Sequence, residues 1–164
     1  MSVIQVKLAK PLELPNRVPL GANFHAAASR RKRLRRELAR EIWVLLGCRL
    51  PKLPMARARV NVQRVGIQAP DQDNLHASVK ALLDVLQPVA KNRAYGLGII
   101  AGDDPTRLEL NVVHVQADHL ADQCTFVTIE DITSLPARAT FKPASDGLHG
   151  RGSLTDQSGK GLDG

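Results

Sequence analysis

The chain has 164 residues, 43% of them hydrophobic, which suits one folded domain with its own core plus a tail. No apolar run approaches the ~20 residues that a membrane span requires, and the first residues lack the basic-then-apolar order of a secretory signal. We therefore expect a cytoplasmic protein with no membrane partner. The two cysteines, Cys48 and Cys124, exclude a disulfide framework and a CxxC metal site.

The formal net charge of +7 favours a polyanionic partner, and its distribution strengthens this interpretation. Six of the eight residues from Ser29 to Arg36 are basic. Aromatic residues make up only 3% of the chain, so base stacking has few candidates. We expect recognition of the duplex backbone rather than of bases, although a solvated helix face would give the same pattern. The predicted DNA-binding residues are Arg30, Arg31, Lys32, Arg33, Arg35 and Arg36.

Hydrophobic periodicity predicts an α/β protein of the α+β type, with a small mixed sheet packed against two main helices. Alternating residues predict the strands, and apolar residues at helical spacing predict the helices. The expected elements are a strand over 3–8, a helix over 23–46, a strand over 57–63, a helix from Pro70 to Leu86, and strands over 108–112 and 126–129.

Beyond about Ser134 the chain is rich in Gly, Ser and Pro and has no apolar periodicity. We expect a folded domain over 1–134 and a disordered tail over 135–164. The tail carries four basic and three acidic residues, so the domain keeps a charge of about +6. The basic character therefore belongs to the domain.

The segment from Pro70 to Leu86 carries the most informative chemistry. On a helical wheel, Asp73, Lys80 and Asp84 share one stripe, and the apolar residues occupy the opposite side. Asp71 lies just before the helix, and Asp73 is the expected N-cap. A second pair, Asp103-Asp104, precedes the strand at Leu108, and a sheet that brought both pairs together would assemble up to four carboxylates. Such a group can hold Mg²⁺, which activates water and stabilises charge on a phosphodiester, while Lys80 neutralises a phosphate oxygen.

Each of these residues also has a structural interpretation. Asp71 and Asp73 favour the start of a helix. Lys80 and Asp84 are spaced as a surface ion pair, and Asp103-Asp104-Pro105 is common turn chemistry.

The motif Asp71-x-Asp73-Asn74-Leu75, with Lys80, Asp84 and Gly102-Asp103-Asp104, resembles the RusA family of Holliday junction resolvases. The resemblance covers roughly residues 3–115. It implies a small α/β homodimer that acts in DNA recombination and repair, binds four-way DNA junctions and makes paired nicks with Mg²⁺. By residue matching it implies metal ligands at Asp71, Asp73, Asp103 and Asp104, and catalytic residues at Asp71, Asp73, Lys80 and Asp104.

The chain departs from the family pattern in two places. Lys80 follows Asn74 by six residues, whereas the best-known form of the motif has a spacing of three, and 92–100 resembles an insertion. Two functions of different classes remain open. One is a Mg²⁺-dependent endodeoxyribonuclease for branched DNA; the other is a non-catalytic basic module that binds DNA or RNA. A phosphatase of the DxDx[TV] type is disfavoured, because Leu75 occupies the position of its Thr or Val.

Overall fold

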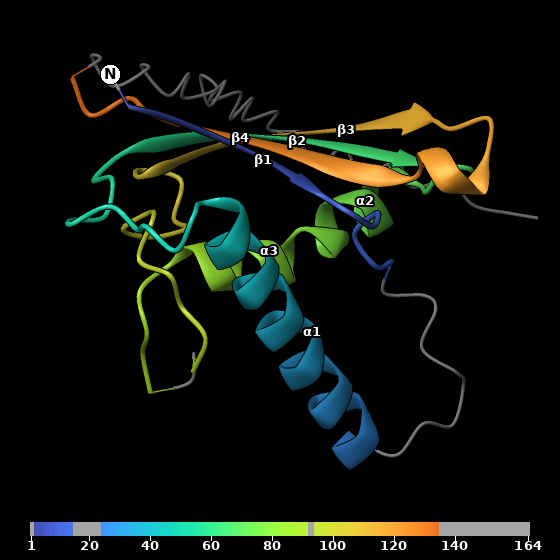
Figure 1. Ribbon diagram of the computed structural model, residues 1–164, viewed down its shortest axis with the longest axis horizontal. Helices are drawn as coiled ribbons and strands as arrows, with labels where there is room; N and C mark the ends of the chain where they lie inside the picture. The colour runs from blue at the N-terminus through green and yellow to red at the C-terminus, as the bar shows by residue number, and fades with distance from the viewer. Residues whose placement is uncertain (1, 15–23, 92–93, 135–164) are drawn as a thin grey trace, which may run out of the picture.

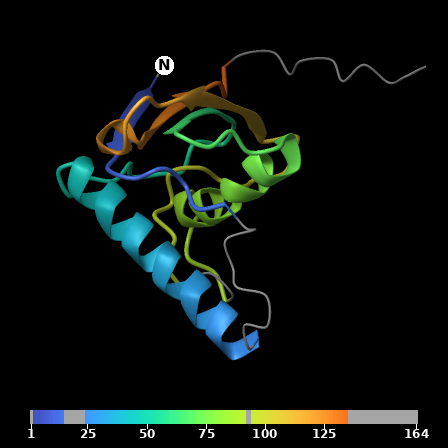
Figure 2. The ribbon, with the colours of Figure 1, turned by 90° about the vertical axis from the view of Figure 1, so that its right-hand side faces the viewer.

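The computed structural model describes residues 2–14, 24–91 and 94–134, in which a sheet lies on one side and the helices on the other (Figures 1 and 2). The expected tail over 135–164 lies outside these residues. The elements, in chain order, are β1 (Val3–Leu8), α1 (Phe24–Leu45), β2 (Ala58–Gly66), α2 (Gln72–Ser78), α3 (Lys80–Leu86), β3 (Leu108–Gln116), the short 3₁₀ helix η2 (Leu120–Asp122) and β4 (Cys124–Asp131). The mixed α/β fold predicted from the sequence is confirmed.

The sheet has four strands in the order β1-β4-β2-β3. β4 is antiparallel to both of its neighbours, whereas β2 and β3 are parallel. The parallel pair needs a crossover, and the segment containing α2 and α3 provides it. This topology sets the ends of the sheet: the segment leading to α2 leaves one end of β2, and the loop before β3 enters at the other.

The core lies between the helix-facing side of the sheet and one face of each main helix. Val60, Val62 and Ile129 are at most 1% exposed on the strands, and Ile42 and Leu82 are fully buried on the helices. Each large aliphatic side chain of this kind contributes roughly 1.5–3 kcal/mol when it is fully removed from water. The predicted apolar face of the helix after Pro70 is confirmed, since all five of its residues are buried: Leu75, Val79, Leu82, Leu83 and Leu86.

The structure differs from the sequence prediction in two local features of that helix. The predicted continuous helix is divided at Val79 into two seven-residue helices, α2 and α3. The N-cap is Asp71 rather than Asp73, because α2 begins at Gln72 and the Asp71 side chain accepts a hydrogen bond from the backbone N–H of Asn74 at 2.7 Å. Asp73 therefore lies inside the first turn.

Alternation along β2 continues past the predicted end of the strand and brings a charged side chain inward. Arg64 is only 3% exposed. Its Nε donates to the carbonyl of Leu12 at 3.1 Å, and its Nη1 donates to the carbonyl of Gln68 at 3.3 Å. The same Nη1 lies 3.2 Å from Nδ1 of His114 on β3. These partners satisfy the buried guanidinium and join the N-terminal segment to the end of the sheet.

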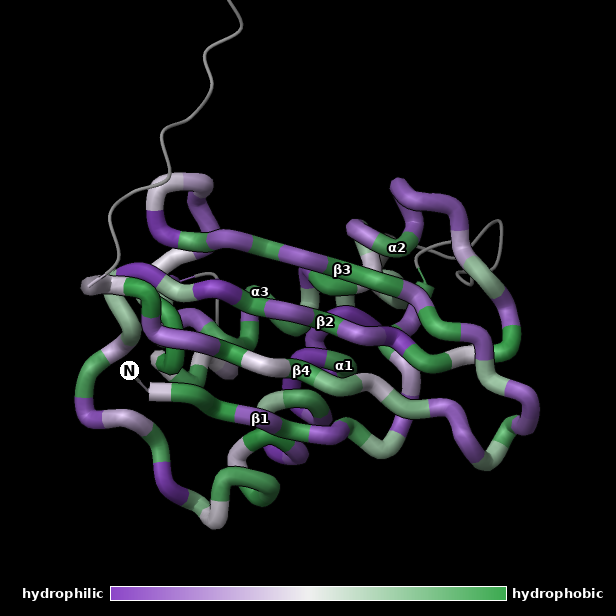
Figure 3. The backbone as a smooth tube through the Cα atoms, turned by 90° about the horizontal axis from the view of Figure 1, so that it is seen from above, coloured by the Kyte–Doolittle hydropathy of each residue, from purple (hydrophilic) through white to green (hydrophobic). Residues whose placement is uncertain are grey.

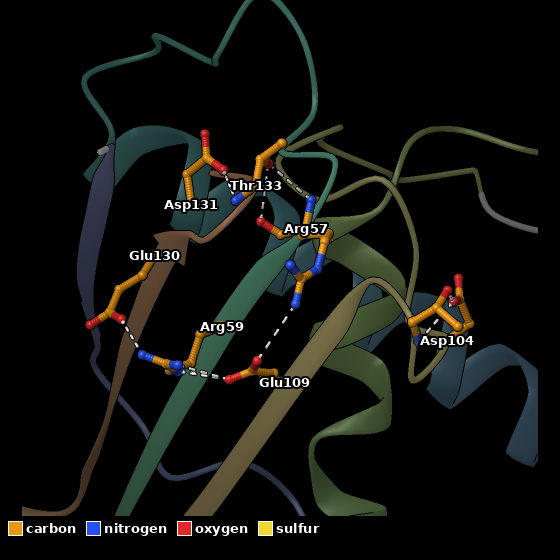
Figure 4. A network of polar contacts seen from close by, with 8 residues as sticks. Arg57, Arg59, Asp104, Glu109, Glu130, Asp131 and Thr133 are labelled. Atoms are coloured by element: carbon orange, nitrogen blue, oxygen red, sulfur yellow. Dashed lines mark hydrogen bonds and ion pairs between the residues drawn. The ribbon is translucent and has the colours of Figure 1, made fainter. Parts of the chain in front are cut away.

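No helix of the described residues lies on the other face of the sheet, and polar residues alternate along its strands (Figure 3). An ion-pair network crosses three strands on this face (Figure 4). Arg59 on β2 donates from Nη2 to Glu109 on β3 at 2.9 Å, and its Nη1 lies 3.4 Å from Glu130 on β4. Hydrogen bonding to Glu109 raises the pKa of Arg59 above its ordinary value. The network joins β2 to both of its neighbouring strands and places Arg59 between two carboxylates.

Candidate nucleic-acid interface

The basic segment of the sequence forms the first half of α1, which extends away from the sheet (Figures 1 and 2). The second half of the helix packs through Leu38 and Ile42, whereas the first half has few buried residues. Four of the six predicted DNA-binding residues are exposed, namely Arg31, Lys32, Arg33 and Arg36. The other two, Arg30 and Arg35, are partly buried. The helix thus presents a dense positive surface, which we call the α1 basic surface and define by these six residues.

Acidic side chains neutralise only part of the α1 basic surface. Arg30 pairs with Glu13 at 3.1 Å, and Arg33 lies 3.9 Å from Glu37 one turn along the helix. Arg35 pairs with Asp84 on α3 at 2.5 Å. The three remaining residues form no ion pair with another described residue. Excess positive charge on an extended helix attracts the phosphates of a nucleic acid and releases their counterions.

A cleft of about 300 Å³ lies where α1 faces the junction of α2 and α3. Its charged lining consists of four cationic side chains and one carboxylate, and its other walls are mostly small or apolar. Lys80 reaches the cleft from α3, which agrees with the wheel that placed Lys80 and Asp84 on one stripe. The charged lining residues are Arg30, Arg31, Arg35, Lys80 and Glu13.

The predicted acidic residues do not converge within one chain. Ala58 pairs with Leu108 at the start of the parallel strands, and Gly66 pairs with Gln116 at their end. Asp71 and Asp73 follow the end of β2, whereas Asp103 and Asp104 precede the start of β3, so nine residues of strand, about 26 Å, separate the ends from which the two pairs extend. Figure 1 shows α2 beneath the arrowhead end of these strands. Among the described residues, the condition for a four-carboxylate group, that the sheet brings the two pairs together, is not met within the single chain.

Two of the four carboxylates have structural tasks. Both oxygens of Asp71 accept hydrogen bonds from Asn74, one from its backbone N–H and one from its side-chain amide at 2.8 Å. Asp104 accepts from the hydroxyl and the backbone N–H of Thr106 and lies 3.5 Å from Arg107. The hydrogen bond from the Thr106 hydroxyl is the main cause that lowers the pKa of Asp104 below its ordinary value. Asp73 and Asp103 are exposed and form no hydrogen bond or ion pair with a described residue.

These positions test the implied magnesium site. Carboxylate oxygens have the right chemistry for Mg²⁺. The described residues nevertheless contain no group of three or more His, Cys, Asp or Glu side chains that could hold a metal ion. The four-carboxylate site therefore does not fit one chain as folded here.

Two features of this region were not predicted from the sequence. The ion pair between Arg35 and Asp84 joins the basic helix to α3, and Glu13 joins the N-terminal segment to Arg30. The wheel gave a signal for the first, because Asp84 lies on the polar stripe opposite the core. Nothing in the sequence indicated the second, since Glu13 lies in an irregular segment between prolines.

The chain matches no protein-family model, no curated protein and no solved structure. Within the described ranges, no helix is both long enough and apolar enough to cross a membrane. The resemblance to the RusA family therefore rests on the quoted residues alone.

Proposed function

We propose that this protein binds branched DNA through the α1 basic surface and cuts it, as an endonuclease of the Holliday junction resolvase class. The observation that carries the proposal is the concentration of six basic side chains on a helix half that projects from the core, with a cationic cleft at its base. A regular helix with this charge density suits a duplex backbone, whose phosphates recur along two strands.

The cutting part of the proposal rests on the start of α2 and on the resemblance of its motif. Asp73 is exposed in the first turn and has no structural partner among the described residues, so its carboxylate is available to a substrate or an ion. Lys80, on the next helix, provides a positive charge that can neutralise a phosphate oxygen as negative charge develops there. We place both residues at the reacting phosphate and retain the homodimer as part of the proposal.

A second candidate is a nucleic-acid-binding module without catalysis, and specific contacts favour it. Asp71 caps α2, Asp84 pairs with Arg35, and Asp104 fixes the turn before β3. In this interpretation the acidic residues stabilise the fold, and only the α1 basic surface contacts nucleic acid. The two candidates share the binding surface and differ in whether the bound DNA is cut.

The deciding experiment compares a labelled four-way junction with a linear duplex, with and without Mg²⁺. We expect the wild-type chain to nick the junction, and Asp73→Asn to abolish nicking while junction binding stays equal or becomes tighter. The arms with and without Mg²⁺ show whether cutting needs the ion. Asp118→Asn is the matched control, because Asp118 is also exposed and lies far along the chain, after β3. Tight binding by a wild type that never cuts would favour the module, and equal nicking by Asp73→Asn would refute the role of Asp73.

The binding surface has its own test in the salt dependence of duplex affinity. Affinity falls as salt rises, so the slope of log K against log salt is negative. Each phosphate contact that is lost should reduce the magnitude of this slope by roughly 1. We expect Arg33→Gln combined with Arg36→Gln to make the slope shallower. Arg49→Gln should leave the slope unchanged, because Arg49 is exposed and lies beyond the helix. The same slope in all three proteins would remove α1 from the interface.

A further inference from the structure

The cleft between α1 and α3 has the features of a binding site for a single phosphate group. We infer that Arg31, Arg35 and Lys80 hold one phosphate there, in addition to the contacts made along the outside of α1. The inference deepens the proposed function and rests on it in one respect, because nucleic acid is the expected source of the phosphate.

The charge of the cleft favours an anion. Its four cationic residues face one lining carboxylate, Glu13, so the lining has an excess of three positive charges. Asp84 reduces the excess to two through its contact with Arg35. A monoester carries up to two negative charges and balances this excess, whereas a diester carries one and balances half of it. Cations that converge from two helices cost electrostatic energy unless an anion lies between them.

Arg35 is held at the cleft and keeps donors that are unpaired among the described residues. Its Nη2 pairs with Asp84, a residue whose side chain is only 13% exposed, and this contact fixes the guanidinium at the cleft. Its Nε is shielded from solvent, so a ligand in the open cleft does not reach that atom. A guanidinium has five N–H donors, and the terminal N–H groups that Asp84 leaves unpaired can donate to a phosphate oxygen.

The cleft has room for a phosphate group. The walls between the cations are formed by small side chains from both sides of the cleft, Ala27 from α1 and Ala77 and Ala81 from the opposite helices. The Ser78 hydroxyl does not donate into the cleft, because it donates to the carbonyl of Leu75 at 2.7 Å. Small side chains leave room for a tetrahedral group near the guanidinium of Arg35 and the amine of Lys80. Recognition therefore comes from the cations, with a shape that admits a phosphate.

The test is a titration of the full chain with inorganic phosphate and, separately, with dimethyl phosphate, at constant ionic strength, followed by NMR. We expect the amide and methyl signals of Ala77 and Ala81 to shift in a saturable manner. Lys80→Gln should weaken the apparent affinity at least tenfold, and Lys80→Arg should restore most of it. Arg40→Gln is the matched control, since Arg40 is an exposed cation of α1 outside the cleft and should leave the affinity unchanged.

The two probes distinguish the sources of the phosphate. Saturation by dimethyl phosphate indicates a backbone diester, and saturation by inorganic phosphate alone indicates a terminal monoester. Shifts that do not saturate, or an affinity that Lys80→Gln leaves unchanged, would overturn the inference. A chain that binds no DNA but still saturates with phosphate would refute the proposed function and keep the cleft. A chain that binds DNA while the cleft responds to neither probe would refute the cleft alone.

Discussion

Asp71 and Asp73 are separated by one residue and both are exposed, yet the structure gives only Asp71 a role in stability. Asp71 accepts two hydrogen bonds from Asn74, at 2.7 and 2.8 Å, whereas Asp73 accepts none from the described residues. Loss of an N-cap acceptor typically costs about 1 kcal/mol, and exposure of the cap keeps the cost near that figure. We therefore expect Asp71→Ala to lower the free energy of unfolding by about 1 kcal/mol and Asp73→Ala to lower it by clearly less.

Urea denaturation followed by circular dichroism measures this difference. With a slope of roughly 2 kcal/mol per molar urea, a loss of about 1 kcal/mol lowers the midpoint by about 0.5 M. Asp71→Asn is the matched control, because asparagine caps helices nearly as well as aspartate and removes only the charge. Equal midpoints for Asp71→Ala and Asp73→Ala, with unchanged slopes, would refute the assignment of the cap and with it the claim that Asp73 has no structural task.

Three further predictions follow from other contacts. A double-mutant cycle of Arg35→Gln and Asp84→Asn should give a coupling of about 1 kcal/mol that falls with added salt, and zero coupling at low salt would contradict the ion pair. Burial lowers the pKa of His114 below its ordinary value of 6.5, so the unfolded chain binds the proton more readily, and stability should be complete above about pH 7 and decrease as the pH falls through 6. His114→Gln should flatten that decrease in unfolding midpoints measured from pH 7 to 5, and the same decrease in the variant would assign it to other groups. Truncation after Ser134 should leave the unfolding midpoint unchanged, and aggregation of the truncated chain would place the domain boundary later.

The elements were predictable from the sequence because their burial follows simple periodicity. Strand β1 matches its predicted bounds, and α1 differs from its prediction by one residue at each end. Strand β4 is longer than the predicted 126–129, since its pairing with β1 and β2 extends the strand to Cys124 and Asp131. Pairing across a sheet is a long-range property, and the residues of one strand do not encode it.

The candidate site was predictable only in part, for a related reason. The stripe of Lys80 and Asp84 follows from helix geometry, but that both residues face α1 does not, because it depends on how the helices pack. To predict whether Asp73 and Asp104 meet, one must know at which end of the sheet each of their loops lies. Parallel pairing of β2 with β3 decides that question, and local spacing carries no information about it.

The pairing of the first and last strands has a consequence for biosynthesis. Among the described strands β1 pairs with β4 alone, in a register that joins Val3 to Glu130 and Leu8 to Thr125, so roughly 120 residues of chain separate the partners. A ribosome that adds about 5–20 residues per second needs on the order of 10 s to make that length. Throughout this interval Val6 and Leu8, which are buried in the finished fold, have no sheet partner. The nascent chain thus carries an unpaired apolar strand until β4 is made, and this is the period in which a chaperone has most to protect.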